Sequence, residues 1–217
     1  MERAFIFDKY NTFADWRLIL TEKSVAPPEP KTNYIELDGM SGTLDLTEAL
    51  TGEVAYKDRT VSASFFASEG TRSERTRLIH KIIALLHGKK IKVIEPDDTS
   101  HYFYGRAKVD VTTNNLAYAE FTVDIVCEPW RYALEESIRT IDVADTVKSL
   151  VINNNGVKTL CPEIDVKGTV NITVDGITTA LTTGNYKMTN LKLKSGANVV
   201  EVSGNGSVSF VYREADL

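Results

Sequence analysis

Alternation of apolar and polar residues runs through much of this chain and predicts β-strands. In residues 118–126 the alternation places Phe121, Val123 and Ile125 at every second position. Residues 60–66 repeat it with smaller side chains. Because successive strand residues point to opposite faces, we expect both strands to bury one face in a core.

The helical spacing of three to four residues appears in residues 72–87. Thr71 and Glu74 have the capping-box pattern, in which each side chain accepts a hydrogen bond from the other residue's backbone N–H. Gly88 is expected to take the left-handed conformation that ends a helix. The predicted buried face contains Leu78, Ile79, Ile82, Ile83 and Leu86, and the predicted opposite face carries Arg75, Arg77 and Lys81.

Residues 27–59 have the composition of turns and connections. Residues 27–31 include three prolines, which lack a backbone donor, so this stretch is expected to be a connecting arm. Leu44 and Leu46 then alternate with polar residues, as in a strand that follows a turn. The turn itself is framed by two glycines and consists of Gly39, Met40, Ser41 and Gly42.

The pattern changes near Trp130, after which short strands follow one another without a helix. We predict a mainly β protein with an α+β N-terminal domain, residues 1–131, whose antiparallel, split-barrel-like sheet carries one helix. A small β-sandwich, residues 151–217, is expected to follow a linker, residues 132–150, in which residues 134–148 form either a strand or a short helix. The sandwich strands are expected at 163–166, 170–174, 177–181, 191–193, 198–202 and 208–212, with a tight hairpin turn at Asp175-Gly176 and another turn at 203–207.

Size and charge fit a globular protein. Of 217 residues, 42% are hydrophobic and 25% charged, which gives no reason to expect disorder. The apolar run 82–86 is far shorter than the roughly 20 residues that span a bilayer, so no membrane insertion is expected. The first residues lack a signal-peptide core, which favours a cytoplasmic site of synthesis. A net charge of −5 with no basic excess in either half argues against gripping nucleic acid, and leaves DNA only as passing cargo.

The residue types that carry catalysis are not arranged for it. The sequence has no nucleophile elbow, phosphate loop, dinucleotide fingerprint or zinc-protease motif, so we predict no enzyme, cofactor or metal site. Cys127 is in phase with the apolar positions of its strand, which predicts a buried thiol. His87 is expected to cap helix carbonyls through its ring N–H. Asp97 and Asp98 are expected to be solvated charges in a turn.

Two tyrosines in the C-terminal half leave two interpretations open. Tyr186 and Tyr212 could form a sugar platform, because aromatic faces stack on pyranose rings. Core packing or hairpin pairing explains both residues at least as well.

Several short elements follow one another in a fixed order along the first 131 residues. They are Asp15-Trp16-Arg17-Leu18, Gly39 to Leu46, Tyr56-Lys57-Asp58-Arg59, Leu86-His87-Gly88-Lys89, Tyr102 to Arg106 and Pro129-Trp130. In this order they resemble the N-terminal domain of the distal tail proteins of long-tailed bacteriophages and prophages. The C-terminal half is similar to the galectin-like or carbohydrate-module-like sandwich of that family, through residues 191–202 and 208–212. Relatives often have a charged pair where this chain has Met40 and Ser41.

The resemblance implies a non-enzymatic structural protein of the virion tail tip, assembled in the cytoplasm of the host bacterium. It implies a ring, usually a hexamer, that joins the tail-tube protein to the tail-associated hub or lysin protein. The outer C-terminal domains would contact receptor-binding proteins. A carbohydrate-binding module that contributes to recognition of the host surface is the alternative function.

A ring closes through a head-to-tail interface, in which different surfaces of one subunit meet. The glycine turn, residues 39–42, is one expected part of this assembly surface. Arg59 and Arg106 lie beside strand ends and are expected to form ion pairs between domains or subunits. An ordinary surface position is the alternative for both arginines.

Overall fold

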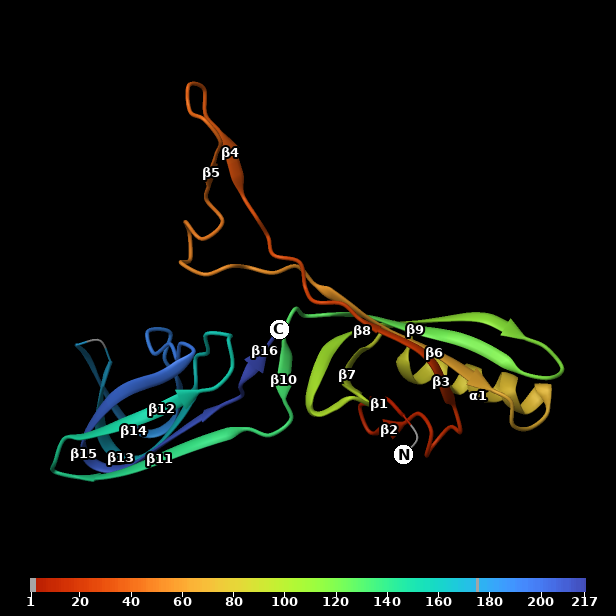
Figure 1. The fold of residues 1–217 in the computed structure, drawn as a ribbon. Coiled ribbons are helices and arrows are strands. Elements are labelled where there is room, and N and C mark those ends of the chain that lie inside the picture. The colour runs from red at the N-terminus through yellow and green to blue at the C-terminus, as the bar shows by residue number, and fades with distance from the viewer. Residues whose placement is uncertain (1–2, 175) are drawn as a thin grey trace. The chain divides into compact units, whose positions relative to one another are not determined.

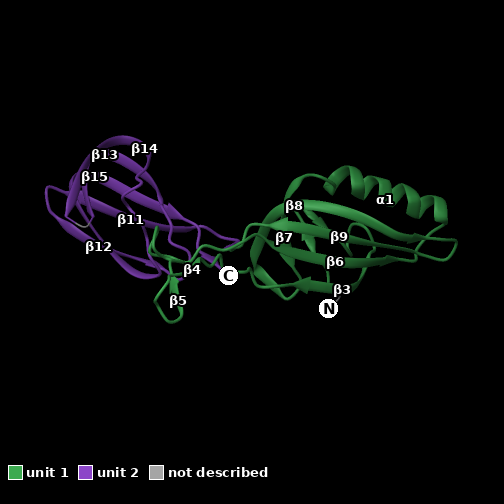
Figure 2. Ribbon diagram, turned by 90° about the horizontal axis from the view of Figure 1, so that it is seen from above, with its two compact units in different colours: residues 1–131, 217 green, residues 132–216 purple. Residues whose placement is uncertain are grey.

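The computed structural model describes residues 3–174 and 176–217, and the chain divides into two compact units. Unit 1 contains the residues up to Arg131 together with Leu217, and unit 2 contains Tyr132–Asp216 (Figure 2). Strands hold 57% of the residues and helix 7%, which confirms the predicted mainly β class. Each unit has a hydrophobic core of its own.

Unit 1 is an antiparallel sheet with a helix packed on it (Figure 1). Its strands follow the order β2-β1-β7-β8-β9-β6-β3, so strands that are distant in the sequence lie side by side. The bounds are β1 (Ile6–Phe7), β2 (Tyr10–Asn11), β3 (Ile19–Val25), β6 (Arg59–Ala67), β7 (Lys90–Glu95), β8 (Asp98–Asn114) and β9 (Ala119–Cys127). Two further strands, β4 (Tyr34–Glu36) and β5 (Thr43–Asp45), form a separate hairpin.

Phenylalanine side chains meet at the centre of unit 1. Phe65 of β6 and Phe121 of β9 are partners in the strand register, and their ring centroids are 5.7 Å apart. Phe5 and Phe7 meet the edge of Phe65 at centroid distances of 6.3 and 6.1 Å. Such edge-to-face contacts are a favoured aromatic geometry. The alternation in β6 and β9 thus places one side of each strand in this core, as the sequence predicts.

Helix α1 spans Arg72–Leu86 and confirms the predicted helix. Its capping box is complete: the Glu74 N–H donates to Thr71 Oγ1 at 3.3 Å, and the Thr71 N–H donates to Glu74 Oε2 at 2.7 Å. Gly88 follows with a φ of +76°, as expected at a helix end. The helix residues that are buried in the core of unit 1 are Ile79, Ile82 and Leu86.

Arg75 lies on the buried face of this helix, so the predicted opposite face is wrong for this residue. Its side chain is only 2% exposed. The guanidinium donates to the carbonyls of Gly70, Asn115 and Leu116, at 2.6, 3.0 and 2.8 Å. Arg75 precedes Ile79 by one helical turn and therefore shares its face. The carbonyls of two loops replace the water that a charged group would otherwise need.

Unit 2 is built from an antiparallel sheet of five strands. The order is β11-β15-β13-β14, and β12 also pairs with β15. The bounds are β11 (Ser137–Ala144), β12 (Lys148–Asn154), β13 (Glu163–Val174), β14 (Ile177–Lys187) and β15 (Gly196–Tyr212). Two short strands, β10 (Arg131–Ala133) and β16 (Ala215–Asp216), pair with each other.

Residues 132–150, expected to form a linker, belong to unit 2. Strand β11 pairs with β15 along its whole length, from Ser137 opposite Tyr212 to Ala144 opposite Asn205. Val143 is buried in the core of the unit. Of the two conformations left open for this segment, the strand is the one observed over residues 137–144, and it is part of the sheet rather than a connection.

Three glycines allow β13 and β15 to continue where the sequence predicts interruptions. Gly168 pairs with Gly206, and Val170 pairs with Gly204, inside the β13–β15 ladder. A Cβ atom on Gly206 would lie 2.1 Å from the Lys167 carbonyl oxygen. Residues 203–207 are therefore no turn: one half of β15 pairs with β12 and the other half with β11. The separate strands expected on either side merge into one strand of 17 residues.

The predicted tight hairpin is present between β13 and β14. Val174 pairs with Ile177, so two residues connect the strands. Gly176 has a φ of +77°, in the left-handed region that such a turn requires. Asp175, the other turn residue, lies outside the described residues.

We expect Gly206→Ala to lower the free energy of unfolding of unit 2 by about 1–3 kcal/mol or more. Alanine would have to adopt a φ that is strained for any residue with a side chain, and its Cβ atom would also collide with the β13 backbone. Gly176→Asn is the matched control, since that site is open and asparagine tolerates left-handed φ. Denaturant unfolding followed by circular dichroism measures both losses. Equal stability of Gly206→Ala and the wild type would contradict the role given to the close strand approach.

Candidate assembly surface

An arm leaves the sheet of unit 1 after β3 and returns at the start of β6. Its two strands are held together at the base by the Lys31 N–H, which donates to the Ala55 carbonyl at 2.7 Å, and by the Lys57 N–H, which donates to the Glu29 carbonyl at 2.8 Å. Lys57 and Glu29 also form an ion pair at 2.8 Å. The proline-rich residues 27–31 thus form one side of a ribbon, in agreement with the predicted connecting arm.

The outer part of the arm is the β4–β5 hairpin, with Ile35 opposite Leu44 and Glu36 opposite Thr43. Both glycines of the tip, Gly39 and Gly42, have a φ of +85°. A two-stranded hairpin that packs on nothing is marginal in water. Residues 31–45 are nevertheless all exposed, so this hairpin has no cover within its own chain.

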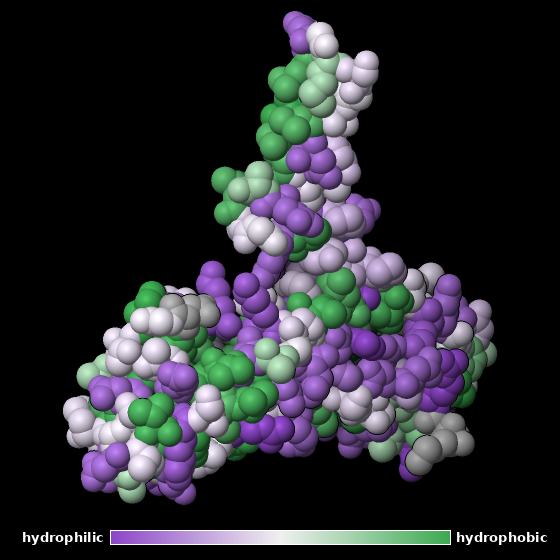
Figure 3. Space-filling view, turned by 60° about the vertical axis from the view of Figure 1, so that its left-hand side comes forward, coloured by the Kyte–Doolittle hydropathy of each residue, from purple (hydrophilic) through white to green (hydrophobic). Residues whose placement is uncertain are grey.

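Apolar side chains gather on this uncovered hairpin, as the green atoms on the protruding arm in Figure 3 show. Leu50, nearer the base of the arm, is 99% exposed. Exposed apolar groups clustered in this way mark interaction sites rather than ordinary surface. The apolar residues of the hairpin that are between 40% and 57% exposed are Tyr34, Ile35, Leu37, Met40 and Leu44.

Charge on the outer part of the arm has one sign. Residues 33–56 contain five acidic residues and no basic one. Because strand residues alternate between faces, the hairpin has an acidic face with Tyr34, Glu36 and Asp45. The opposite face carries Ile35 and Leu44, which are register partners. The hairpin therefore presents one acidic and one apolar face.

The predicted assembly residues lie in three places. Gly39, Met40, Ser41 and Gly42 come together at the tip of the hairpin. Arg106 lies on β8, where its guanidinium donates to the Gly88 carbonyl. Arg59 lies at the start of β6, where the arm returns to the sheet. The fold therefore does not gather the turn and the two arginines into one surface patch.

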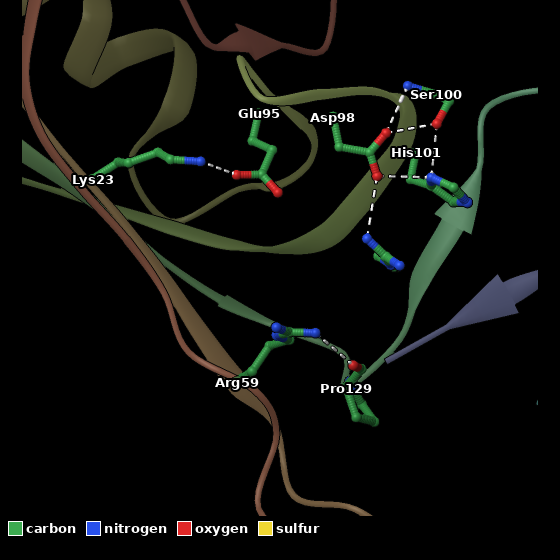
Figure 4. A network of polar contacts seen from close by, with 8 residues as sticks. Lys23, Arg59, Glu95, Asp98, Ser100, His101 and Pro129 are labelled. Atoms are coloured by element: carbon green, nitrogen blue, oxygen red, sulfur yellow. Dashed lines mark hydrogen bonds and ion pairs between the residues drawn. The ribbon is translucent and has the colours of Figure 1, made fainter. Parts of the chain in front are cut away.

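Arg59 is buried, 7% exposed, and binds within its own unit instead of forming the expected ion pair. Its Nε donates to the Ala26 carbonyl at 2.9 Å and its NH1 donates to the Pro129 carbonyl at 3.3 Å. The guanidinium also lies over the Phe103 ring, 5.0 Å from the centroid. Figure 4 shows the bond from Arg59 to Pro129. Arg59 thus joins the outgoing end of the arm, the end of β9 and the face of β8.

Burial lowers the pKa of the Arg59 guanidinium below its usual value. Arginine nevertheless stays protonated in proteins. The two carbonyl dipoles and the aromatic face are the groups that compensate the loss of water. Arg59 therefore acts as a structural clamp at the root of the arm.

Asp97 is an exposed turn residue, as predicted, although it forms ion pairs, whereas Asp98 is partly buried in β8 and the prediction of a solvated turn charge is wrong for it. Lys23 bonds to Glu95 (Figure 4) and to Asp97 at 2.6 Å. Hydrogen bonds from Arg3 and then Lys23 lower the pKa of Asp97 to about 2. A lowered carboxyl pKa adds stability above the ordinary value of about 4, and this stability is lost as pH falls toward 2. Since Asp97 is exposed, the contribution is small.

Asp98 accepts hydrogen bonds from Ser100 and Arg131 and contacts the His101 ring (Figure 4). Burial raises the pKa of Asp98, but the Ser100 bonds and the charge of His101 outweigh it and leave the pKa below its usual value. Both Ser100 Oγ and Asp98 Oδ2 contact the same ring nitrogen, Nδ1 of His101. A catalytic triad needs them on opposite ring nitrogens. The cluster is therefore structural.

The other candidate reactive side chains, Cys127 and His87, also have structural positions within unit 1. Cys127 is fully buried, which confirms the predicted buried thiol, and this burial raises the pKa of the thiol to about 12. The His87 ring accepts a hydrogen bond from the Val109 N–H at 3.1 Å, so the predicted capping of carbonyls by this ring is wrong. Within the described residues, no group of three or more potential ligand side chains could hold a metal ion. No helix in the described part of the chain is long and apolar enough to cross a membrane.

The two tyrosines considered for sugar binding pack within unit 2. Tyr212 is buried, and its hydroxyl donates to the Asn153 carbonyl at 2.7 Å. The Tyr186 hydroxyl donates to the Thr182 carbonyl at 3.0 Å, and its ring covers Gly184. Of the two interpretations, the structure favours core and hairpin packing, because Tyr212 cannot present its ring to a sugar.

The two units together define a class of protein: a helix-bearing β-sheet with a projecting arm, followed by an all-β unit. The solved structure of the Dit protein (gp 19.1) of phage SPP1 has this fold, with a TM-score of 0.72 and 14% sequence identity. The match covers 98% of this chain and 99% of the other. That protein is described as a paradigm of the hub adsorption apparatus in phages that infect Gram-positive bacteria. No family model and no curated protein matches this sequence.

We expect Arg59→Ala to reduce the free energy of unfolding by about 1.5–3 kcal/mol, because a charged donor leaves two carbonyls unpaired. Arg59→Lys should cause a smaller reduction in the free energy of unfolding, since an ammonium keeps the charge but cannot reproduce the planar fork of the guanidinium. Arg77→Ala, an exposed arginine of the helix, is the control and should change stability by less than about 0.5 kcal/mol. Chemical denaturation measures all three, and equal losses for Arg59→Ala and Arg77→Ala would refute the clamp.

Proposed function

We propose that this protein is a structural subunit of the tail tip of a long-tailed phage. The single observation that carries the proposal is the fold match to the SPP1 Dit protein, which extends over both units. Fold alone does not define function, because one architecture hosts many activities. The arm supplies the second argument, since an uncovered apolar hairpin suits a protein that is completed by assembly.

The proposed assembly is a hexameric ring that joins the tail tube to the tail-associated hub and the host-adhesion apparatus. A closed ring uses a heterologous interface, which needs two different surfaces on one subunit. The hairpin is one such surface, with Gly39 and Gly42 shaping its tip. Its apolar face would lose water in the ring, and burial of apolar area is the general driving force for association.

The proposed partners are further copies of this chain, the tail-tube protein, the tail-associated hub or lysin protein, and receptor-binding proteins. The place of action is the virion tail tip, after assembly in the cytoplasm of the host bacterium. The net charge of −5 fits a protein past which DNA moves without being held, since phosphate binding needs a basic excess. We propose no catalytic step.

The test is native mass spectrometry of the purified chain together with negative-stain imaging. We expect a species of about 145 kDa, six times the 24.1 kDa of one chain, that appears as a ring with a central opening. Cys161, the exposed cysteine, should first be replaced by serine so that no disulfide creates an artificial oligomer. A chain that remains monomeric at every concentration would contradict the proposed ring.

A further inference from the structure

A strip of basic and aromatic residues covers the outer face of β7 and β8, on the side away from the core. Ile91 and Val93 of β7 point into the core, so Lys90 and Lys92 point outward. In the strand register Lys90 lies opposite Arg106, and Lys92 lies opposite Tyr104. We call Lys90, Lys92, Tyr104 and Arg106, together with Tyr102, which is only 9% exposed, the basic strip.

The cations of this strip have no carboxylate partner among the described residues. Lys90 Nζ lies over the Tyr104 ring at 5.7 Å, and Lys92 Nζ lies over the Tyr102 ring at 4.7 Å. Arg106 donates to a carbonyl oxygen. Like charges directly opposite one another in a sheet are unfavourable. The pairing of Lys90 with Arg106 therefore leaves a place where an anion lowers the energy.

The strip borders a shallow hollow of about 570 Å³. Lys90, Tyr104 and Arg106 line it, together with Val126, which is 54% exposed. Val126 is the register partner of Arg106 on β9, so it stands on the same face. The strip thus offers positive charge, an aromatic ring and an exposed apolar side chain next to one another. Asp58 and Glu128 also line the hollow, so the positive charge belongs to the strip and not to the whole hollow.

The acidic face of the hairpin has the complementary chemistry. It presents Tyr34, Glu36 and Asp45, and no basic residue occurs between residues 33 and 56. Opposite charges on two surfaces select the partner and its orientation and suppress wrong pairings. The strip and the hairpin are two different surfaces of one chain, which is the requirement of a head-to-tail contact.

We propose that the hairpin of one copy docks with its acidic face on the basic strip of a second copy. This docking rests on the proposed function, because it names the two surfaces that meet in the ring. Glu36 and Asp45 pair with Lys90 and Arg106, whose side chains have no carboxylate partner among the described residues, and Tyr34 lies against the ring of Tyr104. The apolar face of the hairpin stays turned away from the strip and is free for the remaining contacts of the ring.

The experiment reverses charge on each surface separately in the full chain. The strip variant carries Lys90→Glu and Lys92→Glu, and the arm variant carries Glu36→Lys and Asp45→Lys. Both lysines contact only tyrosine rings, and both acids are exposed. Circular dichroism and thermal unfolding confirm that each variant folds. The control variant carries Lys81→Glu and Lys187→Glu, two lysines that are exposed elsewhere.

Native mass spectrometry then measures assembly of each variant alone and of an equal mixture. We expect each of the two variants alone to lose at least about tenfold in association affinity, because like charges meet at every contact. The mixture should form rings again, with the two variants in equal numbers, because every contact then joins opposite charges. The control variant should assemble like the wild type.

The outcomes separate this docking from the ring itself. Rings formed by the strip variant alone, or a mixture that does not recover assembly, overturn the docking while a wild-type ring still supports the proposed function. A wild-type chain that never forms a ring overturns both. Recovery in the mixture cannot follow from misfolding, because two misfolded chains do not restore one another.

Discussion

The buried guanidinium of Arg59 is the interaction on which the proposed role of the arm depends. It bonds to the carbonyls of Ala26 and Pro129, and so fixes the root of the arm to the end of β9. A long hairpin gains nothing from packing when all its residues are exposed. The hairpin can contact a partner at a defined place only if its base is held in a fixed position. A charged group bonded to backbone carbonyls provides such a fixed point at the cost of its hydration.

In unit 2, glycine residues allow two long strands to pair at close range. The paired strands β13 and β15 approach each other so closely that a Cβ atom on Gly206 would collide with the Lys167 carbonyl oxygen. The chain thereby obtains a single strand that pairs with β12 through one half and β11 through the other. This arrangement closes a core of its own, so the arm is the uncovered element of the fold while both units are complete by themselves.

The sequence predicted the elements whose signals are local. The capping box at Thr71, the alternation in β9 and the two-residue hairpin at Gly176 each depend on a few neighbouring residues, and all are present. Interactions between distant segments could not be predicted from the sequence. The burial of Arg75 depends on loop carbonyls 40 residues away, although its position one turn before Ile79 carried a readable hint.

The candidate assembly surface likewise has one part with a local sequence signal and another part that depends on the pairing of distant segments. Turn residues 39–42 could be located from their glycines, whereas the basic strip exists only because β7 and β8 pair in one register. The lack of any basic residue between 33 and 56 is a property of the sequence alone. Its meaning depends on the exposure of the hairpin and on the cations found elsewhere on the same unit, which only the fold reveals.

We infer that the arm turns a chain with two complete cores into an assembling subunit. Sedimentation velocity of a variant in which residues 32–54 are replaced by a short Gly-Ser turn tests it most directly, since Arg59 and the base of the ribbon remain. We expect the shortened chain to be a folded monomer that keeps the unfolding temperature of the sheet, and the full-length chain to sediment as a ring. A shortened chain that still sediments as the same ring would contradict it.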